Sequence, residues 1–282
     1  MYLCDGARKM ISQRIHHIRT FLKRFYSLRH HWASPVSAYQ FLQRVHRKPN
    51  LSDAPVQLHL ANLWFFVRPM DWFAFEEIAL EQEYGFIRRL FCDAPPRVVM
   101  DVGANIGLFS IYAFFVWPSI TIHSIEPSFC TYQVLERNRF TNPELNWHTH
   151  RYAAWKTDGQ VRFENHAYST SSRIAAQDIG GEVVPAISLT TLLSRHVCVS
   201  VDLMKMDIEG AEEAALCGSE TALQSVDRLV VEVHPQLCDP NRVIASLRST
   251  YDFLYRVPGR RSAKPLLLAS HQPYPFPDYS LT

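Results

Sequence analysis

The feature that most constrains the fold is an alternation of apolar strand-like segments and helix-like segments from residue 97 onward. Apolar runs typical of buried strands occupy residues 97–101, 119–125, 146–152, 203–207, 229–234 and 253–257. Helical patterns at 105–115, 128–140, 211–217 and 239–250 lie between them. Parallel strands need crossover helices and are covered on both faces. The alternation therefore predicts an α/β fold with a single doubly wound, mostly parallel sheet.

The chain divides into four segments around this pattern. We expect a basic helical arm over residues 1–50, a lead-in strand and helix over 51–96, the main domain over 97–270 and an irregular tail over 271–282. In the lead-in, residues 62–68 predict a strand and residues 72–91 one helix. In the main domain, Asp158-Gly159 predicts a hairpin within 155–165. Residues 166–185, rich in Ser, Gly and Ala, predict a loop.

The N-terminal arm carries most of the positive charge. Residues 1–50 hold ten Lys/Arg and one acid, a net +9, so the total of +2 leaves −7 on the other 232 residues. Apolar residues recur every three or four positions over residues 8–32, which predicts an amphipathic helix. We expect this helix to pack on its own domain or on a second copy. The alternative is contact of residues 8–32 with an anionic membrane surface.

Cysteine usage and hydropathy indicate the compartment. The six cysteines, at 4, 92, 130, 198, 217 and 238, form no CxxC pair and have neither zinc-site nor disulfide-framework spacing, which favours a reducing compartment. The N-terminus lacks the features of a signal peptide. The most apolar window, residues 108–122, is shorter than the roughly 20 residues that span a bilayer. We therefore expect a cytoplasmic protein, peripheral to a membrane at most.

A glycine-containing turn follows the first strand of the main domain. Asp101 precedes Gly103 and Gly107, which allow a tight turn and a close approach at the start of a helix. The next strand ends in Glu126, nineteen residues after Gly107, where an acid can bridge two ribose hydroxyls. The spacing departs from the G-x-G-x-x-G of dinucleotide sites. S-adenosylmethionine has no pyrophosphate but has an α-ammonium, for which Asp101 is a suitable partner. Tight strand–helix packing is the alternative role of the two glycines.

A second group of ionisable residues lies further along the chain. Lys205, Asp207 and Glu209 alternate along one strand and share a face. The next strand carries Glu232 and His234. If the two strands are neighbours, all five side chains meet at the carboxyl ends of the strands, where open α/β sheets bind ligands. Such burial is costly unless the groups pair or act on a ligand.

Other interpretations of this group stay open. One is a solvated rim of charges with a single salt bridge. Another is a divalent-metal site made of Asp207, Glu209, Glu232 and His234, since hard cations accept carboxylate oxygens; we do not include a metal in the prediction. His234 has two equally supported roles, orienting Glu232 or acting in catalysis.

Four stretches together resemble the FkbM family of methyltransferases, which belongs to the class I, Rossmann-like S-adenosylmethionine enzymes. They are Val98 to Ser110 (VVMDVGANIGLFS), Ile125 to Pro127 (IEP), Leu203 to Glu212 (LMKMDIEGAE) and Val231 to His234 (VEVH). The likeness covers roughly residues 60–257. It implies that the cofactor S-adenosylmethionine is held by Asp101, Gly103, Asn105, Gly107 and Glu126, with Asp207 also in contact. It further implies that the acceptor side is lined by Lys205, Asp207, Glu209, Glu232 and His234.

The resemblance implies methyl transfer to a hydroxyl of a sugar, glycan, polyketide or similar metabolite. The hydroxyl must lose its proton, and we favour Asp207 over His234 as the base, with Lys205 beside it. The basic arm suggests a nucleic-acid methyltransferase as an alternative, but Asp207-Ile-Glu-Gly210 offers no stacking aromatic and repels phosphate. A nicotinamide oxidoreductase is disfavoured by the glycine spacing, and a non-catalytic binding module by the number of gathered ionisable groups. The acceptor's identity and the oligomeric state cannot be predicted.

Overall fold

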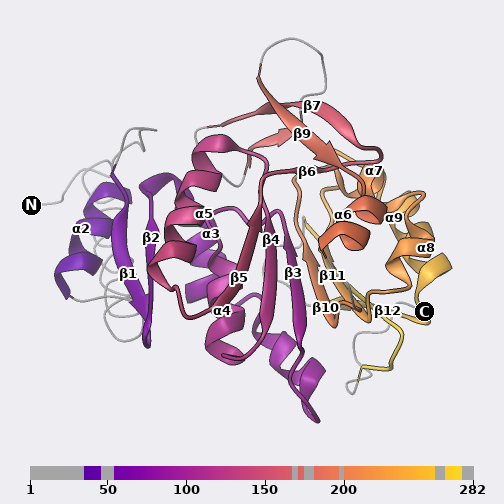
Figure 1. Ribbon diagram of the computed structural model, residues 1–282, viewed down its shortest axis with the longest axis horizontal. Coiled ribbons are helices and arrows are strands. Elements are labelled where there is room, and N and C mark those ends of the chain that lie inside the picture. The colour runs from indigo at the N-terminus through magenta and orange to yellow at the C-terminus, as the bar shows by residue number, and fades with distance from the viewer. Residues whose placement is uncertain are drawn as a thin grey trace, which may run out of the picture.

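The computed structural model describes residues 35–45, 54–166, 171–174, 181–196, 200–257 and 264–274. A seven-stranded sheet forms the centre of the molecule (Figure 1). Its strands, in spatial order, are β12 (Phe253–Val257), β13 (Leu266–Ser270), β11 (Arg228–Glu232), β10 (Leu203–Met206), β3 (Val98–Val102), β4 (Thr121–Ile125) and β5 (Asn146–His150). Only β13 pairs antiparallel with its neighbours. The predicted doubly wound, mostly parallel sheet is therefore confirmed.

Helices cover both faces of this sheet because its strands are apolar on both sides. Val99 belongs to a core shared with α4 (Leu108–Val116) and α5 (Phe129–Thr141). Its neighbour Met100 belongs to a second core on the opposite face. That core is covered by α6 (Leu189–His196), α7 (Glu212–Leu216), α8 (Glu220–Leu223) and α9 (Pro240–Thr250). The two helical layers flank the strands in Figure 1.

The strand β13 was not predicted. Its five residues are all buried and lie between β11 and β12. Residues 253–257 were expected to form the last clear strand, and β12 has these bounds. An antiparallel strand inserted between two parallel ones needs no crossover helix, so the alternation of strands and helices gives no sign of it.

A second, four-stranded sheet crosses the carboxyl ends of the first (Figure 1). It contains β6 (Ala153–Ala154), β9 (Glu182–Ile187), β7 (Gly159–Glu164) and β8 (Arg173–Ile174). The predicted hairpin at Asp158-Gly159 is wrong, because β6 and β7 both pair with β9 and not with each other. The Asp158 carboxylate instead accepts hydrogen bonds from the Ser188 amide (2.8 Å) and the Thr191 hydroxyl (2.8 Å). The predicted loop over 166–185 is also wrong where β8 and β9 occur.

The lead-in segment is more broken than predicted. A hairpin of β1 (Val56–Leu60) and β2 (Leu63–Val67) comes first, although only its second strand was expected. A short segment, η1 (Pro69–Asp71), follows the hairpin. Three further segments replace the single helix predicted over 72–91: α3 (Trp72–Phe75), η2 (Glu76–Leu80) and η3 (Gly85–Phe91). The helix ends because Gln82 adopts a left-handed φ of 54°, a conformation that an α-helix cannot continue through.

Buried polar contacts hold the lead-in against the main domain. Arg68 forms a two-pronged ion pair with Asp71, with N···O distances of 2.9 and 2.8 Å. The same guanidinium donates to the Cys130 carbonyl at 3.2 Å, at the start of α5. Both partners of this pair are buried. The segment is thus fixed beside the carboxyl ends of the sheet.

The N-terminal arm is described only in part. Residues 8–32, predicted to form the basic amphipathic helix, lie outside the described residues. The described part is α2 (Pro35–Val45), whose Pro35 stands at the start of a helix, where its missing N–H costs nothing. Phe41 and Leu42 of α2 are fully buried. In the parts of the chain that the structure describes, no helix is long and apolar enough to cross a membrane.

Candidate active site

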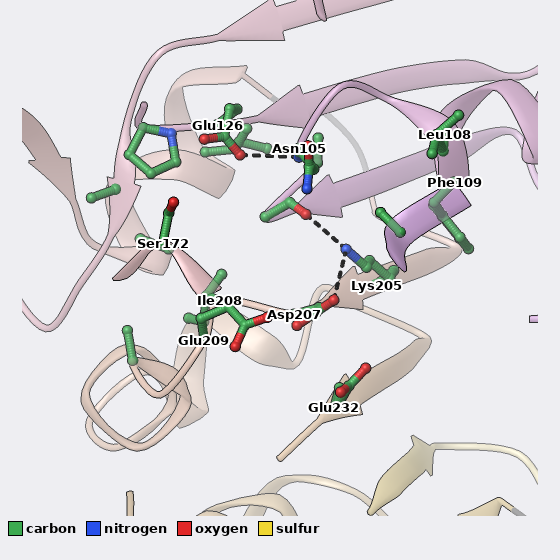
Figure 2. Close-up of a pocket in the computed structure, with 18 of the residues that line it drawn as sticks. Asn105, Leu108, Phe109, Glu126, Ser172, Lys205, Asp207, Ile208, Glu209 and Glu232 are labelled. Carbon is green, nitrogen blue, oxygen red and sulfur yellow. Dashed lines mark hydrogen bonds and ion pairs between the residues drawn. The ribbon is translucent and has the colours of Figure 1, made fainter. Parts of the chain in front are cut away.

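A pocket opens at the carboxyl ends of β3, β4, β10 and β11 (Figure 2). Glu126 and Asn105 lie on one side of it, and Asp207, Glu209 and Glu232 on the other. The second sheet and the lead-in complete the wall. Residues from distant parts of the sequence therefore face one shared space.

The turn after β3 has a glycine for a steric reason. The amides of Gly103 and Ala104 both donate to the Ile125 carbonyl, at 3.0 and 2.9 Å. Gly103 has a φ of +80°, and a Cβ there would lie 1.8 Å from the Asp207 carbonyl oxygen. Only glycine fits so close to the end of β10. The turn brings the β3 and β10 ends of the pocket into contact.

Gly107 has a different role from Gly103. Its φ is +86°, and a Cβ would meet Trp147 at 2.6 Å and Leu135 at 2.7 Å. The glycine thus lets the start of α4 approach β5 and α5. Gly107 does not line the pocket. Of the two roles considered for it, close packing is the one that these contacts support.

Glu126 lies at the end of β4 with both carboxylate oxygens engaged. Oε2 accepts the amide of Asn105 at 3.0 Å, and Oε1 accepts the amide of Ser128 at 3.0 Å. Each oxygen keeps a second lone pair, so the carboxylate can still accept two hydroxyl donors. Burial raises the pKa of Glu126 to about 7, although these two amides and Lys205 act in the other direction. The residue suits a ligand with a pair of adjacent hydroxyls, such as a ribose.

Asp101 lies behind the pocket wall. It is fully buried, its Oδ2 accepts the Ser110 hydroxyl at 2.7 Å, and its Oδ1 lies 3.4 Å from the Lys205 ammonium. Lys205 in turn donates to the Gly103 carbonyl at 2.8 Å. Burial lowers the pKa of Lys205, but Asp101 and Asp207 outweigh it, and the net shift is upward. Asp101 thus pairs with Lys205 and does not itself line the pocket.

The other end of the pocket gathers three carboxylates around Nε2 of His234. The Nε2 atom of His234 lies 3.1 Å from Glu209 Oε2, 3.7 Å from Glu232 Oε1 and 3.8 Å from Asp207 Oδ1. Glu209 follows β10 with a left-handed φ of 50°. A non-glycine residue held in this region stores backbone strain, which is common at functional sites. The convergence predicted for these residues is present, with His234 beneath the pocket surface rather than lining it.

Lys205 and Glu212 also influence the protonation of these side chains. Burial lowers the pKa of His234, but Glu209 and Glu212 outweigh it and raise the pKa to about 11. Burial also raises the pKa of Asp207, but Lys205 and His234 bring it below its ordinary value. Burial and the nearby Asp207 raise the pKa of Glu232 to about 9. At neutral pH, therefore, Asp207 is ionised while His234 carries a proton.

Several pocket residues were not predicted individually. The lead-in contributes Ala74, Glu77, Ile78, Glu83 and Tyr84, and the second sheet and the residue before β8 contribute Phe163, Ser172 and Ile174. The sequence gives only a general indication of both regions. The lead-in is rich in aromatic residues, and the second sheet comes between strands of the main sheet in the chain. No spacing rule identifies the single residues, since their position depends on long-range pairing of short strands.

Comparison with known proteins decides the family. The family model of the methyltransferase FkbM domain matches residues 101–255, more than half of the 282 residues. The chain belongs to the FkbM methyltransferase family. It is therefore a methyltransferase, and the resemblance found in its sequence motifs is confirmed.

Individual relatives of this FkbM-family protein are distant. Hexuronic acid methyltransferase AglP of Haloferax volcanii is 28% identical over 165 residues, which are 58% of this chain and 67% of AglP. The 31-O-demethyl-FK506 methyltransferase FkbM of Streptomyces tacrolimicus is 26% identical over 186 residues, 55% of this chain and 72% of that protein. Among solved structures, the bifunctional kinase-methyltransferase WbdD has 13% identity and a TM-score of 0.39. That match covers 68% of this chain and 38% of WbdD.

Proposed function

We propose that this protein transfers a methyl group from S-adenosylmethionine to a hydroxyl of a sugar or of a similarly hydroxylated metabolite. The observation that carries the proposal is that Glu126 and Asp207 line opposite ends of one pocket. One end suits a ribose, and the other carries an ionised carboxylate beside a buried lysine. S-adenosylmethionine, when bound, supplies an electrophilic methyl group on a sulfonium.

The residues around the glycine turn fit such a ligand. Glu126 can accept hydrogen bonds from both ribose hydroxyls through its remaining lone pairs. The absent side chain at Gly103 keeps the space beside the end of β10 open. Asn105 adopts a left-handed φ of 52° between these two positions and lines the same wall. We assign cofactor binding to Gly103, Asn105 and Glu126, with Asp101 acting through Lys205.

Asp207 is the base that the charges support best. Its Oδ1 is buried and has no hydrogen-bond partner among the described residues, and its pKa is lowered, so it is ionised at neutral pH. His234 is held as a cation by its carboxylate neighbours and cannot accept a proton in that state. Because the pKa of Asp207 is low, most of the rate gain must come from holding the two reactants in contact. The base adds a smaller factor.

The relatives support an oxygen acceptor on a sugar or on a similarly hydroxylated metabolite. One is named for a hexuronic acid, and the other for 31-O-demethyl-FK506, a name that specifies methylation at oxygen. The acceptor end of the pocket carries Asp207, Glu209 and Glu232. These carboxylates can accept hydrogen bonds from several hydroxyls and repel phosphate. A polyhydroxylated acceptor is therefore favoured over a nucleic acid.

The test is a methyl-transfer screen with labelled S-adenosylmethionine against sugars, uronic acids and polyhydroxylated natural products. On the acceptor found, Asp207→Asn should lower kcat by about 10²- to 10⁴-fold, the usual contribution of a general base. Its affinity for S-adenosylhomocysteine should stay close to that of the wild type. The matched control is Asp252→Asn, since the Asp252 side chain is 68% exposed and pairs with His271 at the start of β12. A folded Asp207→Asn enzyme with wild-type kcat would refute the role of Asp207.

A further inference from the structure

The His234 imidazole is oriented from behind by a buried acid. Its Nδ1 lies 2.9 Å from Oε1 of Glu212, a fully buried residue at the start of α7. The same Glu212 oxygen accepts the amides of Ile208 (3.3 Å) and Gly210 (3.1 Å). These bonds fix the carboxylate, so the imidazole ring is fixed as well. A carboxylate that holds the far nitrogen of a histidine is the usual support of a metal-binding imidazole.

The opposite nitrogen of the same ring is buried and has no hydrogen-bond partner among the described residues. His234 is only 3% exposed, and its Nε2 makes no hydrogen bond of acceptable geometry. Asp207 Oδ1 is likewise buried without a hydrogen-bond partner. Both atoms are directed at the same small volume, and Glu232 Oε1 is the third atom around it. Unpaired buried polar atoms are costly, so their convergence points to a ligand.

The spacing of these three atoms fits one cation. The ligand atoms of Asp207, Glu232 and His234 all lie within 4.8 Å of one another. Two ligands that are each about 2.1 Å from one ion can be at most about 4.2 Å apart. The distances from His234 Nε2 to Asp207 Oδ1 and to Glu232 Oε1 are 3.8 and 3.7 Å, inside that limit. No large movement is needed to bring the three atoms onto one ion.

Charge balance also favours a cation. Asp101, Asp207, Glu209, Glu212 and Glu232 bring five carboxylates together, and Lys205 and Lys264 are the ammonium groups that the structure places against them. The Lys264 ammonium lies 3.4 Å from both Glu209 Oε1 and Glu232 Oε1. Without a cation, the protons on His234 and Glu232 supply part of the positive charge that these carboxylates require. A divalent ion that displaces both protons supplies the same two positive charges at the point where the ligand atoms meet.

We propose that Asp207, Glu232 and His234 bind one divalent cation of the Mg²⁺/Mn²⁺ class, with Glu209 beside it and Glu212 as the positioning residue. The cation displaces the proton from Nε2 of His234, while Nδ1 keeps its proton and donates it to Glu212. What the cation does rests on the proposed function: it binds the acceptor hydroxyl and lowers the pKa of that alcohol. The oxygen then bonds to the methyl carbon while the carbon–sulfur bond breaks. The hydroxyl proton passes to the carboxylate of Asp207, and the sulfur leaves as a neutral thioether. The site would compensate for the weak basicity of Asp207.

Manganese binding tests the site without any methyl donor or acceptor. The full chain, freed of metal with a chelator, is titrated with MnCl₂ while the electron paramagnetic resonance signal of free Mn²⁺ is recorded. We expect one Mn²⁺ per chain. Glu232→Gln and His234→Gln should weaken the affinity by at least about tenfold, and Glu212→Gln by about 10- to 100-fold although it does not touch the ion. Asp252→Asn is the matched control and should bind as the wild type.

A gain of affinity separates the proposal from simple misfolding. Lys264→Gln removes a positive charge from the same carboxylates and should tighten Mn²⁺ binding by about tenfold. Lys156→Gln, next to the Trp155 ring and outside the pocket, is the control and should leave affinity unchanged. Absence of Mn²⁺ binding by the folded wild type overturns the proposal, as does wild-type affinity in both Glu232→Gln and Lys264→Gln. Mn²⁺ binding with no transfer to any hydroxyl would instead count against the proposed function alone.

Discussion

At the residue scale, the strand-end acids show what an isolated sequence can and cannot predict. Asp101 and Glu126 each stand at the end of a strand and before a turn, so both are reasonable ligand contacts. The register of the sheet strands decides which of the two faces the pocket. Asp101 pairs across the sheet with Lys205, which neutralises it inside the protein, whereas Glu126 meets backbone amides and faces the pocket. A pattern of single residues does not contain that cross-strand partner.

The raised pKa of Glu126 gives a pH dependence to cofactor binding. Burial raises it from 4.5 to about 7, so the carboxyl is largely protonated at pH 6 and ionised at pH 8. Ribose hydroxyls donate best to the ionised form. Affinity for S-adenosylhomocysteine should therefore rise from pH 6 to pH 8, with proton release on binding near pH 7. Calorimetry in buffers of different ionisation enthalpy measures both effects.

Glu126→Gln is the matching variant. It keeps the shape of the side chain but loses the charge, so affinity at pH 8 should fall by about 10- to 100-fold, as for lost hydrogen bonds to a charged group. The pH dependence should be largely lost in this variant. Equal affinity of the wild type at pH 6 and pH 8 would show that Glu126 does not hold the ribose.

At the element scale, α5 joins the lead-in hairpin to the main sheet through two asparagines. Asn138 Oδ1 accepts the Phe66 amide at 2.6 Å, and its Nδ2 donates to the carbonyls of Phe66 (3.2 Å) and Ile106 (2.7 Å). Asn142, one turn later, bonds both backbone groups of Trp64 in the same way. The side chains thus pair with the edge of β2 as a further strand would. This connection positions the lead-in wall of the pocket.

Asn138→Ala should be strongly destabilising. Asn138 is fully buried, so the change leaves the Phe66 amide and the Ile106 carbonyl without partners. We expect a loss of about 2 to 4 kcal/mol in the free energy of unfolding, measured by urea denaturation. Asn146→Ala is the control, because Asn146 is exposed and should change stability by less than about 0.5 kcal/mol. A similar small effect for both variants would contradict this account of the contact.

A second element-scale feature is a stack of histidines on β4, β5 and α6. The His123 ring lies 4.8 Å from that of His148 and 5.4 Å from that of His150, centroid to centroid, and His150 lies 4.0 Å from His196. Burial and the neighbouring histidines lower the pKa of His123 to about 4. The same causes lower the pKa of His150 to about 3. His123 and His150 are therefore neutral in the native protein at neutral pH.

This stack should make the fold sensitive to acid. The unfolded histidines bind protons near pH 6.5, well above the native pKa values, so the unfolded state gains protons first as the pH falls. The free energy of unfolding should thus decrease from pH 7 to pH 4. Urea unfolding over this range should show a shallower decrease for His150→Phe than for the wild type. His59→Phe on β1, outside the stack, is the control; an unchanged slope in His150→Phe would show that the stack does not cause the sensitivity.

At the scale of the whole molecule, the pocket is made by three parts of which one is predictable. The main sheet follows from its regular alternation, and its strand ends carry the motifs. The second sheet cannot be predicted in this way, since β6 and β8 have two residues each. They form only through long-range pairing, β6 with β9 and β8 with β7. The lead-in wall depends on the contacts of α5 with β2. Short strands and long-range side-chain contacts have no periodicity in the sequence, so the motifs were found and the enclosing walls were not.

A crystal structure of the complex with S-adenosylhomocysteine tests most directly whether one pocket serves both reactants. We predict that the ribose hydroxyls lie within hydrogen-bond distance of Glu126 and that the sulfur faces the end of the pocket formed by Asp207 and Glu232. A complex in which the ligand lies outside this pocket, or has its ribose away from Glu126 and its sulfur away from Asp207, would contradict the proposed function.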